Sequence, residues 1–250
     1  MKLEQVGVQL YTLRSLTETD MLGTLRQLAE IGYRGVELAG FGNSTAGEIR
    51  ATLDELGMRA IAAHIRIDRL EQEADAVLDE LQTLGCEYAV VPWIGEGERS
   101  SLEAVRSLAA RLNRIGQQFQ ASGIRLAYHN HQFEFAPLDN TTMWHTLVAE
   151  TDPALVDFEL DLYWVVVGGY DPVELLQQYG ERITLAHLKD RSHGPDGTFA
   201  PVGTGSLPFP AIIAAAQQTR WFIVEQDTSD APLDDVRTSF RNVQQLVTAV

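Results

Sequence analysis

Short apolar segments that end in polar residues recur along the chain, and segments of helical periodicity separate them. Each apolar segment is rich in β-branched, aromatic or leucine residues and has the length of one strand. Eight segments have this character: residues 6–10, 34–38, 58–64, 87–93, 124–128, 155–161, 183–189 and 220–227. Between them, apolar residues recur every three or four positions, which predicts helices.

The segments between the predicted strands also carry residues that start and stop helices. Apolar faces at helical spacing are clearest in residues 22–31, 70–84, 102–119 and 236–246. Glycines that follow the last apolar position, where a left-handed C-terminal cap occurs, are Gly32, Gly57, Gly85 and Gly123. Residues with the chemistry of N-terminal caps are Asp20, Ser101 and Asp171, the last followed by Pro172.

Eight strands that alternate with eight helices predict an α/β fold with a parallel sheet, because each helix returns the chain to the start of the next strand. At ~30 residues per strand and helix, the simplest closed form is a (β/α)₈ barrel, or TIM barrel. The alternative is a doubly wound open sheet, but residues 11–20 lack the Gly-x-Gly-x-x-Gly sequence that marks many such sheets. We therefore predict a single (β/α)₈ barrel domain over residues 1–250.

Polar side chains gather where the predicted strands end. The strand at 124–128 leads directly into His129, Asn130, His131 and Glu134, a set that a core cannot bury without partners. In the last three strands the polar residues stand two apart, so both members of a pair can point the same way. These pairs are Glu159 and Asp161, His187 and Lys189, and Glu225 and Asp227. Active sites of barrels lie at the C-terminal ends of the strands, so we expect these residues to form one site.

A divalent metal ion is the simplest organiser of such a set. Carboxylates from the fifth, sixth and eighth strands and an imidazole from the seventh would suit Mn²⁺, Mg²⁺, Co²⁺ or Fe²⁺ and, less specifically, Zn²⁺. Structural alternatives exist: Glu37 can pair with Arg34 or Lys189 instead. Asp161 can cap a turn, and His187 can be a core histidine. Such alternatives would have to hold on four consecutive strands, so we favour the metal.

The charge balance excludes some classes of function. The chain has 19 Lys and Arg against 35 Asp and Glu, a formal net charge of −16. It would repel phosphate backbones and anionic lipids, so neither nucleic acid nor a membrane is an expected partner. Its single cysteine, Cys86, excludes an internal disulfide and is expected to pack as a small apolar side chain. Residues 1–10 do not resemble a signal peptide, and no apolar run approaches membrane-spanning length, so we expect a soluble cytoplasmic protein.

Six motifs follow one another in a distinctive order. They are GYRGVELAG (32–40), LAYHNHQFEF (126–135), FELDLYWVVVGGYDP (158–172), AHLKD (186–190), PVGTGSLPFPAI (201–212) and IVEQD (223–227). In this order they resemble the xylose-isomerase-like sugar phosphate isomerase/epimerase superfamily, which includes inosose dehydratases, ketose 3-epimerases and the endonuclease IV type of AP endonuclease. The resemblance covers nearly the whole chain and implies a TIM barrel enzyme acting on a sugar or polyol. Family members often form homodimers. Six histidines and the acidic charge do not supply the metal cluster or basic groove of the endonuclease branch.

The resemblance implies a single divalent metal ion held by Glu, Asp, His and Glu from strands five to eight. Carried over to this sequence, the ligands are Glu134, Asp161, His187 and Glu225. One departure is that Tyr128 stands where the epimerase branch has its first Glu, so Glu134 must return through the loop. If Glu134 is not a ligand, His129 or His131 is next. The Tyr-His-x-His pattern is similar to that of the dehydratase and dehydrosugar-lyase branch.

The resemblance also implies the chemistry. A metal ion bound to a carbonyl and the neighbouring hydroxyl stabilises the enediolate that forms when the adjacent proton is removed. Return of the proton gives isomerisation or epimerisation of a keto-sugar, which is our main interpretation. Loss of a β-hydroxyl or β-alkoxyl group instead gives dehydration or elimination from an inosose or 3-dehydro-sugar. A non-catalytic sugar-binding barrel is the third alternative.

Candidate roles follow from these alternatives. His131 is the candidate general base or acid, with His129 beside it and Glu225 sharing the proton transfer. Lys189 would hold the negatively charged oxygen or the substrate hydroxyls. The candidate sugar-binding residues are Glu37, His64, Trp93 and Trp164, of which the two tryptophans can equally pack at the rim.

A loop at 201–209 bears on whether the substrate carries a phosphate group. Gly203 and Gly205 could present backbone N–H groups to an anion, but the loop contains no Lys or Arg. Two glycines that shape a turn before a helix capped by Ser206 are the favoured interpretation. We therefore expect an unphosphorylated sugar, inosose or keto-sugar.

Overall fold

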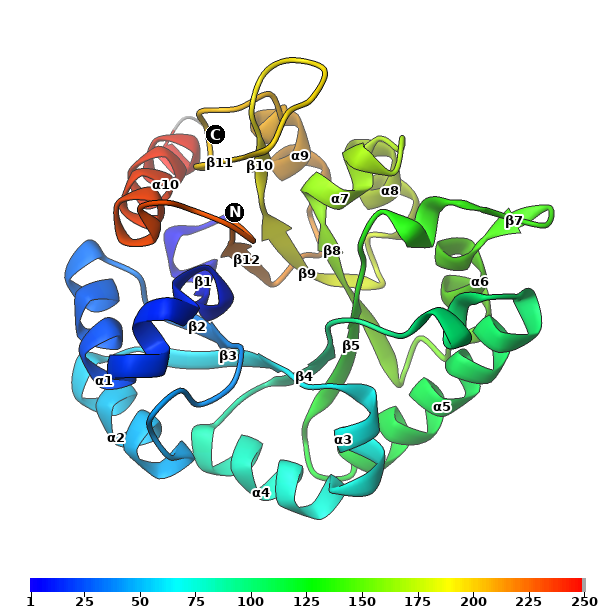
Figure 1. Ribbon diagram of the computed structural model, residues 1–250, viewed down its shortest axis with the longest axis horizontal. Coiled ribbons are helices and arrows are strands. Elements are labelled where there is room, and N and C mark those ends of the chain that lie inside the picture. Colours follow the sequence, from blue (N-terminus) through cyan, green and yellow to red (C-terminus); the bar gives the residue numbers. More distant parts are fainter. Residues whose placement is uncertain (249–250) are drawn as a thin grey trace.

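Eight parallel strands close into a barrel in the computed structural model, which describes residues 1–248 (Figure 1). The strands are β1 (Val6–Gln9), β2 (Gly35–Leu38), β3 (Arg59–His64), β4 (Tyr88–Val91), β5 (Arg125–His129), β8 (Val156–Asp161), β9 (Ile183–Leu188) and β12 (Trp221–Val224). They hydrogen-bond in chain order, and β12 pairs with β1 to close the barrel. The predicted (β/α)₈ barrel and its eight strands are confirmed.

Helices form an outer ring around the strands (Figure 1). The ring comprises α1 (Arg14–Ile31), α2 (Ala46–Leu56), α3 (Ile67–Gln72), α4 (Ala74–Leu84), α5 (Leu102–Gln120), α6 (Met143–Glu150), α7 (Leu162–Val167), α8 (Pro172–Tyr179), α9 (Phe209–Ala215) and α10 (Pro232–Thr248). Short 3₁₀ helices are η1 (Leu3–Gln5), η2 (Leu10–Leu13), η3 (Glu96–Arg99) and η4 (Phe133–Phe135). Among the helices of residues 1–248, none has the length and apolar character needed to cross a membrane.

Most of the predicted helix ends are confirmed. Gly32, Gly57 and Gly85 have positive φ and are the C-cap residues of α1, α2 and α4. The side chains of Ser101 and Asp171 accept N–H bonds from the first turns of α5 and α8. Gly123 has a φ of +78° just after α5, where its N–H donates to the Gln120 carbonyl and the Ile124 N–H donates to the Phe119 carbonyl, as in a left-handed C-terminal cap. One predicted cap is wrong: Ser206 donates to the Arg191 carbonyl, and α9 begins only at Phe209.

Apolar side chains fill the inside of the barrel. This inner cluster consists of Ile61, Ala62, Tyr88, Val90, Ala127, Leu185, Trp221 and Ile223, and every member is buried. Gly7 and Gly35 make room for it, because a Cβ atom at either position would overlap the Cδ1 atom of Ile61. A larger apolar cluster packs the strands against the surrounding helices.

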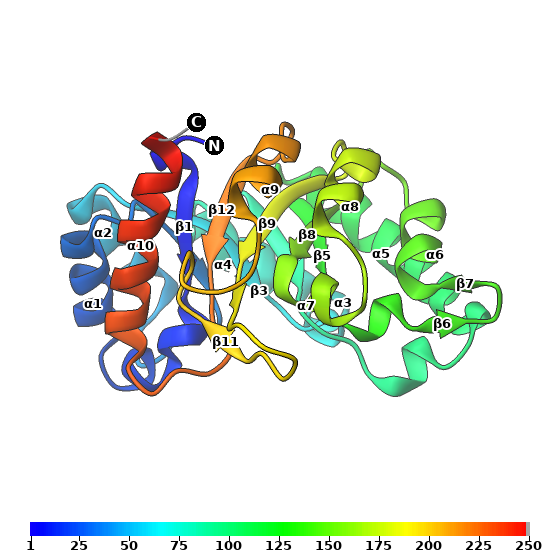
Figure 2. The ribbon, with the colours of Figure 1, turned by 90° about the horizontal axis from the view of Figure 1, so that it is seen from above.

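The C-terminal ends of the strands point to one end of the barrel, and the N-terminus lies beside the end of α10 at the other (Figure 2). Two short hairpins that were not predicted extend the loops at the strand C-termini: β6 (Pro137–Leu138) with β7 (Thr141–Thr142), and β10 (Asp190–Arg191) with β11 (Phe199–Ala200). The strand register places polar residues of neighbouring strands side by side: His129 pairs with Glu159, and Asp161 pairs with His187. The barrel therefore brings the predicted site residues to one level.

Candidate active site

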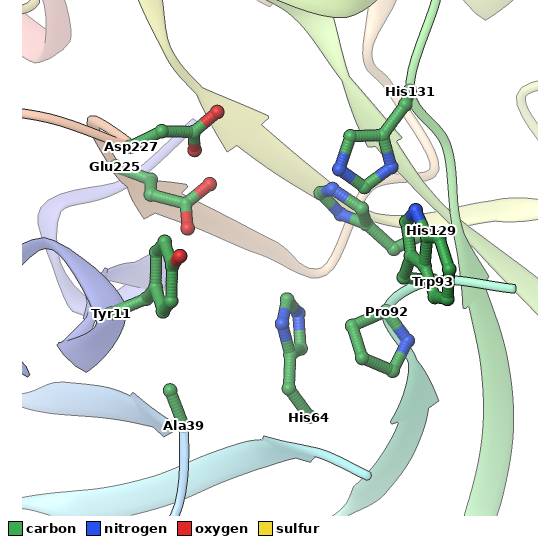
Figure 3. A pocket seen from close by; sticks show the side chains of 9 residues that line it. All are labelled: Tyr11, Ala39, His64, Pro92, Trp93, His129, His131, Glu225 and Asp227. Atoms are coloured by element: carbon green, nitrogen blue, oxygen red, sulfur yellow. The ribbon is translucent and has the colours of Figure 1, made fainter. Parts of the chain in front are cut away.

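A cavity of about 410 Å³ opens at the C-terminal ends of the strands (Figure 3). Figure 3 shows Glu225 and Asp227 on one wall. His131 and His129 lie on the opposite wall, and His64 lies between the two. The remaining lining residues are Tyr11, Ala39, Pro92 and Trp93, of which Tyr11 is 42% and Trp93 46% exposed.

Asp161, His187 and Glu225, three of the predicted ligands, lie together at the strand ends. One donor atom from each lies within 4.8 Å of the others. His187 Nδ1 is 2.7 Å from Glu225 Oε2 and 3.9 Å from Asp161 Oδ2. Asp161 Oδ1 accepts the Trp164 N–H (3.0 Å) and caps α7. One carboxylate oxygen of Asp161 is therefore a helix cap, while the other faces the cluster.

Glu159 forms the centre of a second cluster. Its Oε2 atom is 2.9 Å from His64 Nε2, 3.0 Å from His129 Nδ1 and 3.2 Å from His187 Nε2. Burial alone would raise the pKa of Glu159, but these three imidazoles hold it well below its usual range. Because His187 also belongs to the first cluster, the two groups form one continuous network.

Glu37 joins this network from strand β2. Its Oε2 atom is 2.7 Å from His187 Nε2, and its Oε1 atom is 3.5 Å from His64 Nε2. Burial, followed by the nearby Glu159 carboxylate, raises the pKa of Glu37 to about 7. Glu37 thus pairs with imidazoles rather than with Arg34 or Lys189.

Lys189 is a buried ammonium group surrounded by carboxylates. Its Nζ atom is 2.7 Å from Asp161 Oδ2, 2.7 Å from Glu225 Oε2 and 2.6 Å from Asp227 Oδ1, and the side chain is 1% exposed. Burial alone would lower the pKa of Lys189, but the three carboxylates hold it well above its usual value. The amine is therefore protonated and shares two carboxylates with His187.

The chemistry of this site fits a divalent cation. The carboxylates of Glu37, Glu159, Asp161, Glu225 and Asp227 outnumber the cationic groups that contact them. Within residues 1–248, the Oε1 atoms of Glu37 and Glu159 accept no hydrogen bond although they are buried. Carboxylate oxygens and imidazole nitrogens are the donors that Mn²⁺, Fe²⁺, Co²⁺ and Zn²⁺ accept, so the residues present suit such an ion.

Glu134 lies apart from this network. Its Oε1 atom accepts the Tyr128 hydroxyl (2.7 Å), and its Oε2 atom accepts the His131 backbone N–H (2.7 Å). The side chain is fully buried, and burial raises the pKa of Glu134 to about 8. The structure therefore brings together three of the four predicted ligands without Glu134. His129 lies closer to them, with Nε2 at 3.8 Å from Asp161 Oδ2.

His131 lies between two aromatic side chains at the edge of the cavity. The Phe133 ring is parallel to its imidazole with centroids 5.5 Å apart, and the Trp164 ring lies at 5.7 Å. The guanidinium of Arg99 lies over the Phe133 ring, 4.0 Å from its centroid. Burial, followed by the charge of Lys189, lowers the pKa of His131 to about 4. The imidazole is therefore neutral near pH 7 and can accept a proton.

Comparison with known proteins identifies the family of this chain. A model of the xylose isomerase-like TIM barrel family matches residues 25–246. The chain belongs to this family. The predicted resemblance is thus confirmed. Among xylose isomerase-like proteins, an inosose dehydratase from Geobacillus kaustophilus is 28% identical over 248 residues, which cover 83% of this chain and 80% of that protein.

Solved structures of xylose isomerase-like proteins share the barrel. A sugar phosphate isomerase/epimerase from Parabacteroides distasonis is 26% identical and superposes with a TM-score of 0.84, covering 96% of this chain and 93% of that chain. The IolI protein, solved with a bound zinc atom, gives a TM-score of 0.74 at 14% identity and covers 98% of each chain. At that identity the likeness is one of fold.

Some residues of this xylose isomerase-like site were given no role by the sequence. Glu159 and Asp227 stand two positions from Asp161 and Glu225, and this spacing was the available signal for both. Tyr11 had no signal, because it follows β1 within the 3₁₀ helix η2 and no charged residue or histidine stands beside it. Trp164 contacts His131 next to the cavity, whereas Trp93 lines it.

Proposed function

We propose that this chain is a divalent-metal-dependent enzyme that removes the proton next to the carbonyl group of an unphosphorylated keto-sugar or keto-polyol and then eliminates a neighbouring hydroxyl or alkoxyl group. The observation that carries the proposal is the convergence of Asp161, His187 and Glu225 beside the cavity. Figure 3 shows that Glu225 faces the neutral His131 on the opposite wall. The similarity to inosose dehydratases supports elimination. This similarity supports dehydration, our alternative interpretation from the sequence, at least as well as it supports isomerisation or epimerisation, our main one.

Asp161, His187 and Glu225 would hold the metal ion, and we assign the fourth donor to His129 rather than to Glu134. His129 Nε2 is the nearer donor atom, whereas both carboxylate oxygens of Glu134 already accept hydrogen bonds from Tyr128 and His131. When bound, such an ion supplies a Lewis acid for the carbonyl and the adjacent hydroxyl oxygen. The donor set accommodates Mn²⁺, Mg²⁺, Co²⁺, Fe²⁺ or Zn²⁺.

Proton transfer falls to residues on opposite walls of the cavity. His131 is neutral and lines one wall, so it can accept the proton from the carbon next to the carbonyl. Lys189 and Asp227 lie on the other side, 2.6 Å apart, and Asp227 lines the cavity. This pair can hand a proton to the departing hydroxyl group, which balances the proton taken by His131.

The remaining lining residues suit a sugar or polyol. Trp93 and Tyr11 offer exposed aromatic faces for the apolar side of a ring. His64 lines the cavity and provides a polar atom for a sugar hydroxyl group, and the buried Glu37 lies behind it, with its Oε1 atom 3.5 Å from His64 Nε2. The acidic surroundings disfavour an anionic substrate, in agreement with a ligand that carries no phosphate.

Isomerisation or epimerisation is the second candidate function. Epimerisation needs a proton acceptor and a proton donor on opposite faces of the carbon, and the same two walls supply them, whereas isomerisation returns the proton to the neighbouring carbon. The sugar phosphate isomerase/epimerase with a TM-score of 0.84 supports this candidate. The two candidates differ in their products, because elimination loses water or an alcohol whereas isomerisation and epimerisation keep the substrate mass.

Deuterium exchange tests the proposal. Metal-depleted protein is reloaded with Mn²⁺, Co²⁺, Mg²⁺ or Zn²⁺ and incubated in D₂O with a panel of inososes and keto-sugars. We expect metal-dependent exchange of the proton next to the carbonyl, followed by loss of water. Asp161→Asn should abolish exchange, whereas Asp171→Asn, which only removes a carboxylate cap of α8, should retain it. No exchange across the panel by metal-loaded protein would contradict the proposal and favour a non-catalytic sugar-binding barrel.

A further inference from the structure

Four backbone N–H groups converge on the carboxylate of Asp190, directly after β9. Gly203 and Gly205 donate to its Oδ2 atom at 2.9 and 2.8 Å. Arg191 and Leu207 donate to its Oδ1 atom at 2.8 and 3.2 Å. The carboxylate is fully buried, and a buried anion is tolerated only where such donors replace water.

The loop between β11 and α9 is shaped around this carboxylate. Gly203 has a φ of +81°, which favours glycine. A Cβ atom at Gly205 would lie 2.5 Å from Asp190 Oδ1 and would overlap the Arg191 carbonyl oxygen, so only glycine allows this close approach. Both glycines that the sequence suggested as anion-binding positions are thus used, and the anion they bind is part of the chain.

The same loop is fixed from its other side by α10. The Val202 N–H donates to Ser239 Oγ (3.0 Å), and Asn242 Nδ2 donates to the Val202 carbonyl (2.7 Å). The Arg191 guanidinium is turned away toward the carbonyls of Gly194 and Pro195, at 3.1 and 2.7 Å. Backbone N–H groups, rather than a cationic side chain, therefore neutralise Asp190.

We propose that residues 201–207 form a cradle for a small oxyanion, which the chain fills with its own Asp190 carboxylate. Barrel enzymes that bind phosphorylated substrates often use backbone N–H groups after the seventh and eighth strands for the phosphate. Here Asp190 occupies that kind of position, so the loop is ordered without a phosphate group from the substrate. This inference goes beyond the proposed function, because Asp190 is fully buried and the cavity is lined by other residues. It also predicts that removal of the carboxylate opens a site for formate or inorganic phosphate.

Asp190→Ala tests the proposal through measurements that involve no catalysis, so its result is independent of the proposed reaction. We expect a Tm about 5–10 °C below that of the wild type and faster amide hydrogen exchange at Arg191 and in residues 201–207, because the N–H groups of Arg191, Gly203, Gly205 and Leu207 lose their acceptor. Sodium formate or inorganic phosphate should restore both, saturably, and sodium chloride of equal ionic strength should not. The wild type should respond to neither anion.

Asp171→Ala is the matched control. It removes a carboxylate that accepts a single N–H group, from Val173 at 2.8 Å, so it should lose stability without recovery in formate. If Asp190→Ala does not fold, Asp190→Asn tests the proposal instead. Its side-chain NH₂ group would face the converging backbone N–H donors and could not accept their hydrogen bonds. An Asp190→Asn protein as stable as the wild type would overturn the proposal, as would an Asp190→Ala protein that keeps its stability or responds to chloride as strongly as to formate.

Discussion

The Nδ1 atom of His187 lies 2.7 Å from the Oε2 atom of Glu225; His187 belongs to β9, and Glu225 directly follows the neighbouring strand β12. Asp161 from β8 completes the group. Since removal of even an indirect partner of a metal ligand typically costs tenfold or more in affinity, we expect Asp161→Asn and His187→Ala to weaken divalent metal binding at least about tenfold. Calorimetric titration with Mn²⁺ and metal analysis would measure this. Stoichiometric metal in both variants would contradict the ligand assignment.

Removal of Lys189 is expected to make the protein depend more on metal. Lys189→Met leaves the carboxylates of Asp161, Glu225 and Asp227 without their ammonium partner, which destabilises the metal-free state through like-charge repulsion. A divalent ion should then raise the Tm of the variant more than that of the wild type. Lys2→Met, which removes an exposed ion pair with Glu4, is the control. Equal metal-induced shifts in all three proteins would show that Lys189 and the metal do not share these carboxylates.

Because Glu134 is buried, we expect the free energy of unfolding to fall as the pH rises. The pKa of Glu134 is about 8 in the folded protein against 4.5 for an ordinary glutamate, so the folded state keeps a proton that the unfolded state releases between these values. The free energy of unfolding should therefore fall from pH 5 to pH 8, by at most about 1.4 kcal/mol per pH unit from this group. Urea unfolding of the wild type and Glu134→Gln at several pH values would measure the difference.

The Glu134→Gln variant should lack this component, because an amide does not ionise. Curves of wild type and variant that run parallel across this range would contradict the assignment. The variant also distinguishes the two candidate fourth ligands. Retained metal affinity agrees with His129, and a loss comparable to that of Asp161→Asn supports the prediction that Glu134 is a ligand.

His131 is expected to act in proton transfer and not in metal binding. His131→Ala should slow deuterium exchange into a responsive keto-sugar about 10²–10⁴-fold, the usual contribution of a general base, while metal content stays unchanged. His193→Ala, which removes an exposed imidazole in the β10–β11 hairpin region, should leave exchange intact. Exchange at the wild-type rate in His131→Ala would assign the base to another residue.

The fold was predictable because barrel strands are short and buried on both sides. Each strand therefore reads as a compact apolar run, and each helix between them as an amphipathic segment. The site was predictable where it depends on strand geometry. Asp161, His187 and Glu225 meet because parallel strands end at one level, and their partners two residues away face the same way.

Glu134 could not be placed in this way, because it lies in a loop. Its position depends on hydrogen bonds to Tyr128 and to the His131 backbone, which strand periodicity does not specify. The use of Gly203 and Gly205 by Asp190 was hidden for the same reason, since the carboxylate and the glycines are separated by the β10–β11 hairpin. Homodimer formation, the identity of the divalent metal ion and the cytoplasmic location stay predictions.

The inner cluster around Ile61, for which Gly7 and Gly35 leave room, limits how ligands can reach the site. Because side chains fill the barrel below the site, substrate must enter and product must leave through the same mouth, beside Tyr11 and Trp93. The two molecules then exclude one another. Because both occupy the same cavity, accumulated product should inhibit turnover competitively with substrate, and the inhibition pattern in initial-rate kinetics would measure this mutual exclusion.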